Sequence, residues 1–475
     1  MKRYETLANT MAAEIRAGQA AAGSRMPSLR QVIAQHGVNQ STVLRAYSLL
    51  EEWGLVRARE RSGYYVARGG AVGTPALAKA GAANAASLAQ SAKVDINTLV
   101  FSVLDAARHP DIVPLGSAFP SPKLFPLPRL AKSLASATRF VNPWSTVVDL
   151  PPGNEPLRRQ IAFRYMAIGA PQPVDEIVIT SGALEALNLC LAAVTRPGDA
   201  VAIESPGFYA ALQAIERLDL RAVEIPVDPE TGLDLAALEQ ALAQYPIRAC
   251  WFMTNFQNPT GTTLSPEKKK ALVELITRHD VPLIEDDVYG ELHFQPDYPL
   301  PAKAFDTAGL VMHCSSYSKT LAPGYRVGWV SAGRYADKVQ QLKLMTTLSA
   351  SIPAQAGIAD YLQHGGYDKH LRKLRGELQR QQAAMEDAIA RWLPRDVRYA
   401  VPDGGYFLWL ELPDEIDAMQ LHRQATAHGF SIAPGPIFSA RHAYRRCIRL
   451  NFGHPWTPQI EASMKTLGRL LNAGQ

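Results

Sequence analysis

The chain has 475 residues, which is too long for one small domain, and a prior of about 150 residues per domain predicts roughly three compact units. Its 47% hydrophobic and 20% charged residues are ordinary for a soluble globular protein, and every apolar run is interrupted well before the length of a membrane span. The first residues lack the apolar core of a signal peptide, so we expect a cytoplasmic protein with no membrane partner.

Charge is distributed unevenly along the chain. Residues 1–70 carry ten Lys or Arg against five Asp or Glu, which equals the formal net charge of +5 of the whole chain, so the remainder is neutral. A basic excess confined to one end indicates a module that binds a polyanion, joined to a neutral body.

The cysteines show no metal-ligand spacing. They stand far apart in the sequence, at Cys190, Cys250, Cys314 and Cys447. We therefore expect buried, reduced thiols and no metal site.

The basic end contains three predicted helices and a hairpin. The apolar spacing predicts a helix over residues 4–18, a second short helix opened by Pro27-Ser28, and a third from Asn39 or Ser41 to about Trp53. The buried faces of these helices are predicted to be Tyr4, Leu7, Met11 and Ile15; Leu29, Val32 and Ile33; and Val43, Ala46, Tyr47 and Leu50. The segments LVRARE and GYYVA follow as two short strands joined by residues 61–63.

This order of elements predicts a winged helix-turn-helix. In that arrangement the third helix enters the major groove, where its exposed residues Gln40, Ser41, Thr42 and Arg45 would face base edges. Arg30, at the start of the second helix, would reach a phosphate. A plain helical bundle with a basic surface is the alternative, and the hairpin and the segregated charge disfavour it.

The same segment resembles the N-terminal reader of the GntR regulators. It carries Pro-Ser-x-Arg, Thr-Val-x-x-Ala and Glu-x-x-Gly-Leu in the family order, followed by a glycine in the wing, over about the first 66 residues. The resemblance implies double-stranded DNA as partner. It also implies DNA contacts at Ser28, Arg30, Ser41, Thr42, Arg45 and Gly63. We place this DNA-binding domain at residues 1–68.

A stretch poor in large apolar residues follows the reader. It is rich in Ala, Gly and Ser, a composition that cannot bury a core, so residues 69–93 are predicted to be a linker. The body then occupies residues 94–475.

In the body, apolar strand-like runs alternate with amphipathic helices. The predicted strands lie within residues 176–182, 200–207, 248–261, 281–289, 310–319 and 328–333. This alternation predicts an α/β fold with a mostly parallel sheet covered on both faces. Ligands of such sheets bind at the carboxyl ends of the strands.

The residues at those ends provide an amine, a carboxylate, an arginine and an aromatic ring. They are Ser181, Gly182, Ala183, Phe208, Asn258, Asp286, Tyr289, Ser316, Lys319 and Arg326. Neither a Gly-x-Gly-x-x-Gly dinucleotide motif nor a P-loop is present among them. A lysine amine bonds an aldehyde, a carboxylate pairs with a ring nitrogen, and an arginine with helix-terminal amides holds a phosphate. The set therefore suits a flat, phosphorylated heteroaromatic aldehyde, with Phe208 or Tyr209 stacked on its ring.

The body is similar to the fold-type I aminotransferases that use pyridoxal 5′-phosphate. Asn-Pro-x-Gly begins at Asn258, Asp-x-x-Tyr at Asp286, and Ser-x-x-Lys at Ser316. The resemblance, which also covers PDGGYFLWLELP and APGPIF, implies a small C-terminal α+β subdomain. It implies these roles: Lys319 as the catalytic Schiff-base lysine, Asp286 on the pyridine nitrogen, Asn258 and Tyr289 on the ring hydroxyl, Ser316, Arg326 and the Gly182 and Ala183 amides on the phosphate, and Arg449 on a substrate or effector carboxylate.

A GntR-type reader joined to such a body is the arrangement of the MocR regulators. The resemblance implies a homodimeric transcription factor that binds pyridoxal 5′-phosphate and senses a small amine, an amino acid or the cofactor itself. An aminotransferase with an accessory reader is the alternative. Val147, Val148 and Asp149 disfavour it, because they occupy the region where aminotransferases often carry a tyrosine for the partner subunit's phosphate. A third possibility is a scaffold that has lost its cofactor, which the intact Lys319 argues against.

Overall fold

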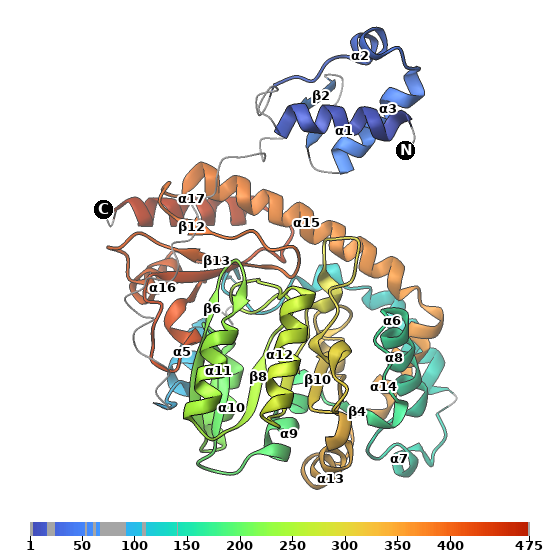
Figure 1. The fold of residues 1–475 in the computed structure, drawn as a ribbon, viewed down its shortest axis with the longest axis vertical. Coiled ribbons are helices and arrows are strands. Elements are labelled where there is room, and N and C mark those ends of the chain that lie inside the picture. The colour runs from blue at the N-terminus through green and yellow to red at the C-terminus, as the bar shows by residue number, and fades with distance from the viewer. Residues whose placement is uncertain are drawn as a thin grey trace. The chain divides into compact units, whose positions relative to one another are not determined.

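The chain divides into two compact units, residues 1–76 and 77–475 (Figure 1). The structure, a computed structural model, describes residues 3–16, 24–52, 55–59, 63–66, 92–106, 111–139 and 141–473. Residues 69–91 of the predicted linker lie outside the described residues. Its last two residues form a strand of the second unit, β3 (Ala92–Lys93).

The first unit is a winged helix-turn-helix, as predicted. It consists of α1 (Arg3–Arg16), α2 (Leu29–His36), α3 (Gln40–Glu52) and an antiparallel hairpin of β1 (Val56–Arg59) and β2 (Gly63–Val66). The predicted stripe of α3 is fully buried and packs on Leu7, Met11 and Ile15 of α1. The hairpin turn and the predicted end of the third helix at Trp53 lie outside the described residues.

Local hydrogen bonds fix the ends of the reader helices. Ser28 caps α2 in a capping box with Gln31, and the left-handed Gly37, at φ 60°, ends it. Asn39, one of the two predicted caps of α3, accepts the Thr42 amide at 2.9 Å. The chain is therefore turned sharply between α2 and α3, as a helix-turn-helix requires.

The second unit is built on a mostly parallel sheet, which confirms the predicted fold class. Its strand order among the described residues is β3-β6-β5-β8-β9-β10-β11-β4, with β7 paired to β6. Among the described strands of this sheet, β3, β7 and β11 run in the direction opposite to the others. The strands other than β3 are β4 (Ile177–Thr180), β5 (Ala200–Ser205), β6 (Arg221–Asp228), β7 (Gly232–Leu233), β8 (Ile247–Phe252), β9 (Leu283–Asp286), β10 (Val311–Ser316) and β11 (Gly328–Ser331).

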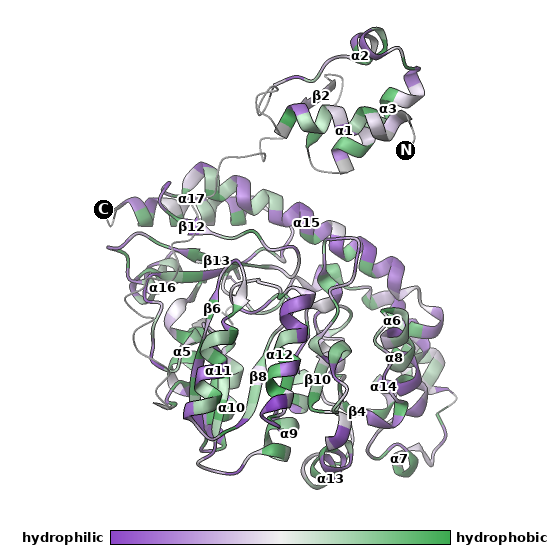
Figure 2. Cartoon of the chain, viewed as in Figure 1, coloured by the Kyte–Doolittle hydropathy of each residue, from purple (hydrophilic) through white to green (hydrophobic). Residues whose placement is uncertain are grey.

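Helices cover both faces of this sheet. Val201 and Ile203 of β5 pack into one apolar cluster with α9 and α10, whereas Ala200 and Ala202 pack into another with α11 and α12. The strands are mainly hydrophobic, while α12 and α15 carry hydrophilic stretches (Figure 2). The helices are α5 (Asn97–Ala106), α6 (Leu127–Thr138), α7 (Ser145–Val148), α8 (Glu155–Ala167), α9 (Ala183–Val194), α10 (Tyr209–Arg217), α11 (Leu235–Gln244), α12 (Pro266–Arg278), α13 (Ala336–Thr346), α14 (Ile352–His364) and α15 (Tyr367–Trp392).

The C-terminal part forms the predicted small α+β subdomain. An antiparallel sheet of order β12-β13-β15-β14 packs with α16 and α17. Its elements are β12 (Arg398–Tyr399), β13 (Phe407–Glu411), α16 (Ala418–Ala427), β14 (Ala433–Pro434), β15 (Cys447–Asn451) and α17 (Pro458–Ala473). Among the described residues no helix has the length and apolar character needed to cross a membrane.

One carboxylate joins the beginning of the second unit to α10. Glu216 of α10 accepts the backbone amides of Ile96 and Asn97 at 2.7 and 3.0 Å, and Gln213 donates to the Asn97 side chain. These amides lie at the start of α5, four residues after Ala92 opens β3. The start of α5 is thereby held to α10.

Candidate functional site

The predicted site residues of the body lie at one edge of the large sheet. Gly182 follows β4, Phe208 follows β5, Asn258 follows β8, and Asp286 ends β9. Ser316 ends β10, with Lys319 in the turn after it. Because these strands are parallel, their carboxyl ends meet at the same edge. Arg449 enters from β15 of the small sheet.

Lys319 is half-buried, and its amine is held by the segment that precedes α6. Its amine donates to the Ala118 carbonyl at 2.9 Å and lies 3.8 Å from the centre of the Phe119 ring. Burial, helped by the charges of Arg449 and Arg326 and opposed by Asp286, lowers the pKa of Lys319 to about 7. A lysine with this pKa is largely unprotonated just above neutral pH, the form that attacks carbonyl carbon.

Asp286 is a buried carboxylate with one unused oxygen. Only 1% of the residue is exposed, and its Oδ1 atom has no hydrogen-bond partner among the described residues. Burial and the neighbouring Asp287 raise its pKa to about 7, against the opposing charges of Lys319 and His313. A buried carboxylate in this state is stabilised by a cationic partner that also donates a hydrogen bond.

Asn258 and Arg449 form one unit. The Asn258 Oδ1 atom accepts from an Arg449 Nη1 at 2.7 Å, and the other Arg449 Nη atom donates to the Gly116 carbonyl at 2.8 Å. Arg449 is fully buried between the rings of Phe407 and Phe438, and burial lowers its pKa. No described carboxylate forms an ion pair with it. A buried guanidinium held only by neutral oxygens is a strong site for an anion.

The site therefore gathers three buried polar atoms that have no partner among the residues described. They are Asp286 Oδ1, Asn258 Nδ2 and Arg449 Nε. Such orphaned groups are costly in a folded protein unless a ligand satisfies them. An acceptor, a neutral donor and a cationic donor fit a ring nitrogen, a ring hydroxyl and a carboxylate, in that order.

At the opposite end of the site, an arginine and the first amides of a helix could bind a phosphate. Arg326, in the left-handed conformation at φ 51°, donates to the Ser181 carbonyl at 3.1 Å and to the Ser318 hydroxyl at 3.2 Å. Gly182, at φ 93°, precedes α9, and a Cβ atom there would lie 2.4 Å from Arg326. The amides at the start of α9 and the guanidinium thus converge where Gly182 leaves room.

Three aromatic residues, Tyr289, Phe208 and Tyr209, are predicted to lie beside the cofactor ring. Tyr289 is buried, packs edge-on against Tyr406, and has a pKa raised by burial. Phe208 is half-buried at the N-cap of α10, whereas Tyr209 is buried against Phe438. Of the two stacking candidates, Phe208 is therefore the more accessible ring. Ser316 is buried, and its hydroxyl accepts the Ser318 amide at 3.3 Å.

Sequence reasoning missed a segment that covers the amine. Residues 116–119 place the Gly116 carbonyl on Arg449, the Ala118 carbonyl on both Lys319 and Tyr406, and the Phe119 ring over Lys319. The stretch containing Tyr406 was noted as a match to the small subdomain but given no role. The covering segment carries no local motif, because its partners lie about 200 to 330 residues away in the sequence.

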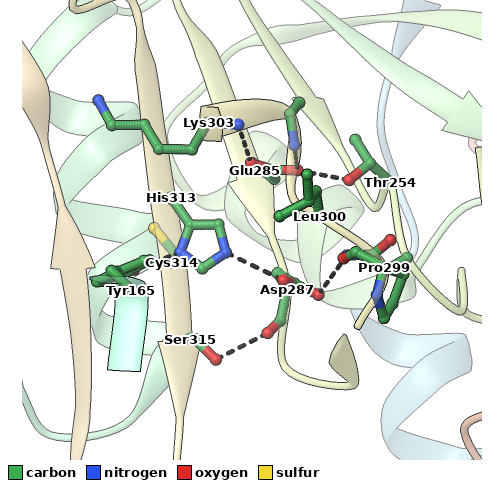
Figure 3. Close-up of polar contacts among 12 residues, drawn as sticks. Tyr165, Thr254, Glu285, Asp287, Pro299, Leu300, Lys303, His313, Cys314 and Ser315 are labelled. Atoms are coloured by element: carbon green, nitrogen blue, oxygen red, sulfur yellow. Dashed lines mark hydrogen bonds and ion pairs between the residues drawn. The ribbon is translucent and has the colours of Figure 1, made fainter. Parts of the chain in front are cut away.

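A buried polar network on the other side of β9 was also missed. Figure 3 shows His313 pointing at Asp287, with Tyr165 beyond it and Glu285 near Lys303 and Thr254. The His313 Nε2 atom lies 3.0 Å from Asp287 Oδ2, and its Nδ1 atom lies 2.6 Å from the Tyr165 hydroxyl. The acidic run Glu285-Asp286-Asp287 was the available signal, since alternate residues of a strand face opposite sides.

On the reader, some predicted DNA contacts also take part in helix-capping hydrogen bonds. Ser28 is occupied in the cap of α2, and the Ser41 hydroxyl donates to Asn39 at 3.0 Å. Gln40 and Arg45 are exposed on α3, with Arg45 5.2 Å from the centre of the Tyr4 ring. The remaining predicted contact residues are placed as follows: Arg30 in α2, Thr42 half-buried in α3, and Gly63 at the first position of β2.

Comparison with known proteins identifies the family. Residues 3–66 match the bacterial regulatory proteins of the gntR family, and residues 151–461 match aminotransferase class I and II. An HTH-type transcriptional regulator of Escherichia coli, YdcR, is 49% identical over 471 residues, which cover 99% of both chains. The chain belongs to the MocR-type GntR regulators.

The second unit of this MocR-type regulator is similar to solved aminotransferases. The multiple substrate aminotransferase of Thermococcus profundus aligns with a TM-score of 0.73 and 28% identity, covering 79% of this chain and 94% of that one. LysN of Thermus thermophilus, an α-aminoadipate aminotransferase solved with N-(5′-phosphopyridoxyl)-L-leucine, aligns with a TM-score of 0.71 and 28% identity, covering 82% and 96%. The cofactor of this MocR-type regulator is pyridoxal 5′-phosphate, as predicted.

Proposed function

We propose that this protein is a transcription regulator in which a small amino acid or amine, bound beside pyridoxal 5′-phosphate, changes the hold of its readers on DNA. The observation that carries the proposal is the set of three orphaned buried atoms on Asp286, Asn258 and Arg449. A scaffold that had lost its ligands would have no reason to keep these costly groups unsatisfied.

The cofactor supplies an aldehyde and an electron-withdrawing ring when it is bound. Lys319 would bond the aldehyde, and Asp286 would accept a hydrogen bond from the protonated ring nitrogen. Asn258 and Tyr289 would donate to the ring hydroxyl, and the half-buried Phe208 would stack on the ring. The phosphate would lie on Ser316, Arg326 and the amides of Gly182 and Ala183.

Arg449 makes an α-amino acid the favoured effector class. Its buried guanidinium is held by two neutral oxygens and has an unused Nε donor. A carboxylate would form charge-assisted hydrogen bonds there, which are about twice as strong as neutral ones. An amine without a carboxylate would leave this donor set unsatisfied and would bind more weakly.

The segment 116–119 would change its contacts when the effector binds. Its carbonyls bind Arg449 and Lys319, the same two side chains that a carboxylate and an aldehyde would engage. A bound ligand therefore competes with this segment for both donors, which gives it different contacts in two arrangements of the protein. Such a difference in contacts is what a ligand needs in order to shift a conformational equilibrium.

Exposed apolar side chains support a homodimer. Trp144, Val147 and Val148 at α7 are mostly exposed, as are Met345 and Leu348 at the end of α13. Both elements lie at the lower end of the second unit in Figure 1, and large apolar surface of this kind marks an interface. A groove of about 280 Å³ beside α7, lined by Val141, Asn142, Ser145, Val148, Asp149, Asn154 and Ile352, among others, offers a place for a partner's side chain. Two readers in one dimer would suit a two-part operator in the cytoplasm.

Turnover as an aminotransferase is the second candidate. The lowered pKa of Lys319, once the amine is released, suits a base that moves a proton from a substrate α-carbon. Val147 and Val148 lie in the region where aminotransferases often carry a tyrosine for the partner subunit's phosphate. Their presence disfavours turnover as an aminotransferase.

One titration separates these functions. Amino acids and simple amines are added to the cofactor-loaded protein while absorbance, keto-acid release and affinity for the DNA upstream of its own gene are followed. A spectral change that stops after one equivalent and alters DNA affinity is the expected result for a regulator. Many equivalents of keto acid with unaltered DNA affinity would instead establish the enzyme. An absorbance spectrum unaffected by pyridoxal phosphate would contradict both.

A further inference from the structure

Asp287 is a buried carboxylate that the proposed function does not use. Side chains alternate along β9, so that Asp286 faces the cofactor side whereas Glu285 and Asp287 face the opposite side, toward His313 (Figure 3). Asp287 is only 2% exposed. It follows Asp286 directly in the chain, so that it lies close behind the carboxylate predicted to hold the ring nitrogen.

One chain of hydrogen bonds reaches Asp287 from Trp329. The Trp329 indole donates to the Tyr165 hydroxyl oxygen at 3.0 Å, which directs the hydroxyl proton toward His313 Nδ1 at 2.6 Å. His313 then carries its own proton on Nε2 and donates it to Asp287 at 3.0 Å. An imidazolium would leave the Tyr165 proton without an acceptor among the residues described, so the chain favours a neutral His313.

A second chain reaches Asp287 from Lys269. The buried Lys269 amine donates to Asn255 Oδ1 at 2.5 Å, and Asn255 Nδ2 lies 3.3 Å from Asp287 Oδ1. Both oxygens of Asp287 therefore accept, which is the arrangement of an ionised carboxylate. The Asp287 backbone is fixed as well, because its amide donates to the Cys314 carbonyl and its carbonyl accepts from Ser315.

Glu285 faces the same side, but its carboxylate is bound by a different set of donors. Its oxygens accept from the Thr254 hydroxyl and from the backbone amides of Ala302 and Lys303 at 2.5 to 2.9 Å. Asp287 instead ends two chains of hydrogen bonds, one that begins at Trp329 of β11 and one that begins at Lys269 of α12. It is also the charge that, after burial, most raises the pKa of Asp286.

We propose that Asp287 is a positioning residue: a fixed negative charge behind Asp286 that strengthens the preference of the site for a protonated ring nitrogen. The proposal rests on the proposed binding of pyridoxal phosphate. Two carboxylates attract one shared cation more strongly than one carboxylate does, and little solvent screens the pair at this depth. The bound ring therefore keeps its nitrogen proton to higher pH than Asp286 alone would allow.

The test compares pyridoxal phosphate with an analogue in which a C–H group replaces the ring nitrogen. Dissociation constants of both are measured by absorbance titration for the wild type, Asp287→Asn and Asp286→Asn. We expect the wild type to prefer pyridoxal phosphate, Asp286→Asn to lose the preference, and Asp287→Asn to lower it about tenfold. Asp280→Asn, a surface variant whose side chain pairs with Arg334, should retain the full preference.

The ratio of the affinities for pyridoxal phosphate and for the analogue separates an effect of charge from an effect of packing. A damaged fold would weaken the binding of both ligands and leave the ratio unchanged. Asp287→Glu, which restores the charge, should recover most of the preference. If Asp287→Asn does not fold, Asp287→Ser is measured in its place. The titrations are made at about pH 8.5, because the bond to Asp287 and the charge of Glu285 raise the pKa of His313 against burial and the charge of Lys303. An imidazolium would offset the charge of Asp287.

Two outcomes would overturn the inference. One leaves the proposed cofactor site intact, and the other overturns the proposed function as well. If the neutral variants keep the wild-type ratio while Asp286→Asn abolishes it, Asp287 has no such role, and the cofactor site itself stands. If the wild type binds neither ligand, the proposed function fails together with the inference.

Discussion

At the scale of single residues, Lys319 shows how burial prepares a side chain for chemistry. Its amine is removed from water, donates to one carbonyl, and lies near two guanidinium groups. Removal from water and the charges of Arg449 and Arg326 disfavour the ammonium form, against the opposing charge of Asp286. With a pKa of about 7, roughly half of this side chain is a neutral amine at neutral pH, the form that attacks a carbonyl carbon.

We expect the rate of capture of pyridoxal phosphate by the cofactor-free protein to level off above neutral pH. The neutral amine is the attacking form, and with a pKa of about 7 its fraction rises roughly tenfold from about pH 6 to 8 and little thereafter. Stopped-flow absorbance would measure the rate, with N-acetyl-lysine amide as the reference amine. A rate that continues to rise tenfold per unit above pH 8, as the reference should, would show that Lys319 has an ordinary pKa.

At the scale of elements, the proposed phosphate site depends on the turn from β4 into α9. Gly182 has a positive φ, which L-residues rarely adopt, and it leaves the space that Arg326 occupies. The position thus combines a backbone requirement with a packing requirement.

We expect Gly182→Ala to weaken pyridoxal phosphate binding by at least about tenfold, because the new methyl group would displace the arginine. Fluorescence titration would measure this affinity. Gly198→Ala is the matched control, since Gly198 has a similar φ of 91° but no atom within 4 Å of an added Cβ. Both variants should lose about 1 kcal/mol of stability to backbone strain. Equal cofactor affinities in the two variants would show that the contact with Arg326 is unimportant.

The same scale shows what the sequence could predict. Buried strands, caps and helix stripes are local patterns, so α3, the Ser28 cap and the strand ends from Gly182 to Lys319 follow from reading along the chain. The partners of Lys319 and Asp287 do not. Ala118 meets Lys319 across 201 positions, and Tyr165 meets His313 across 148. Side chains brought together only by tertiary packing leave no periodic signal in the sequence.

At the scale of the whole molecule, the exposed apolar residues of α7 and α13 are a surface that a partner would bury. Trp144 and Val148, one helical turn apart, and Met345 of α13 are each more than 70% exposed, which is unusual for large apolar side chains. A second copy of the chain is the partner that a two-part operator would require.

We expect Val148→Asp to raise the dimer dissociation constant by at least about tenfold, because the carboxylate would lose its water at the interface. The isolated fold should be unaffected, since Val148 is 74% exposed. Sedimentation velocity over a range of concentrations would measure the effect. Val401→Asp, an exposed valine of the small subdomain, is the control. Unchanged association of Val148→Asp would place the contact between copies elsewhere.

The hydrogen bonds from Ile96 and Asn97 to Glu216 mean that both ends of α10 make defined contacts. Its first turn follows Phe208, the ring predicted to stack on the cofactor, and its last turn binds the amides at the start of α5. Nine helical residues form a stiff rod of about 13 Å. A ligand that displaces the Phe208 ring would therefore act at one end of this helix, while the other end holds the amides of Ile96 and Asn97.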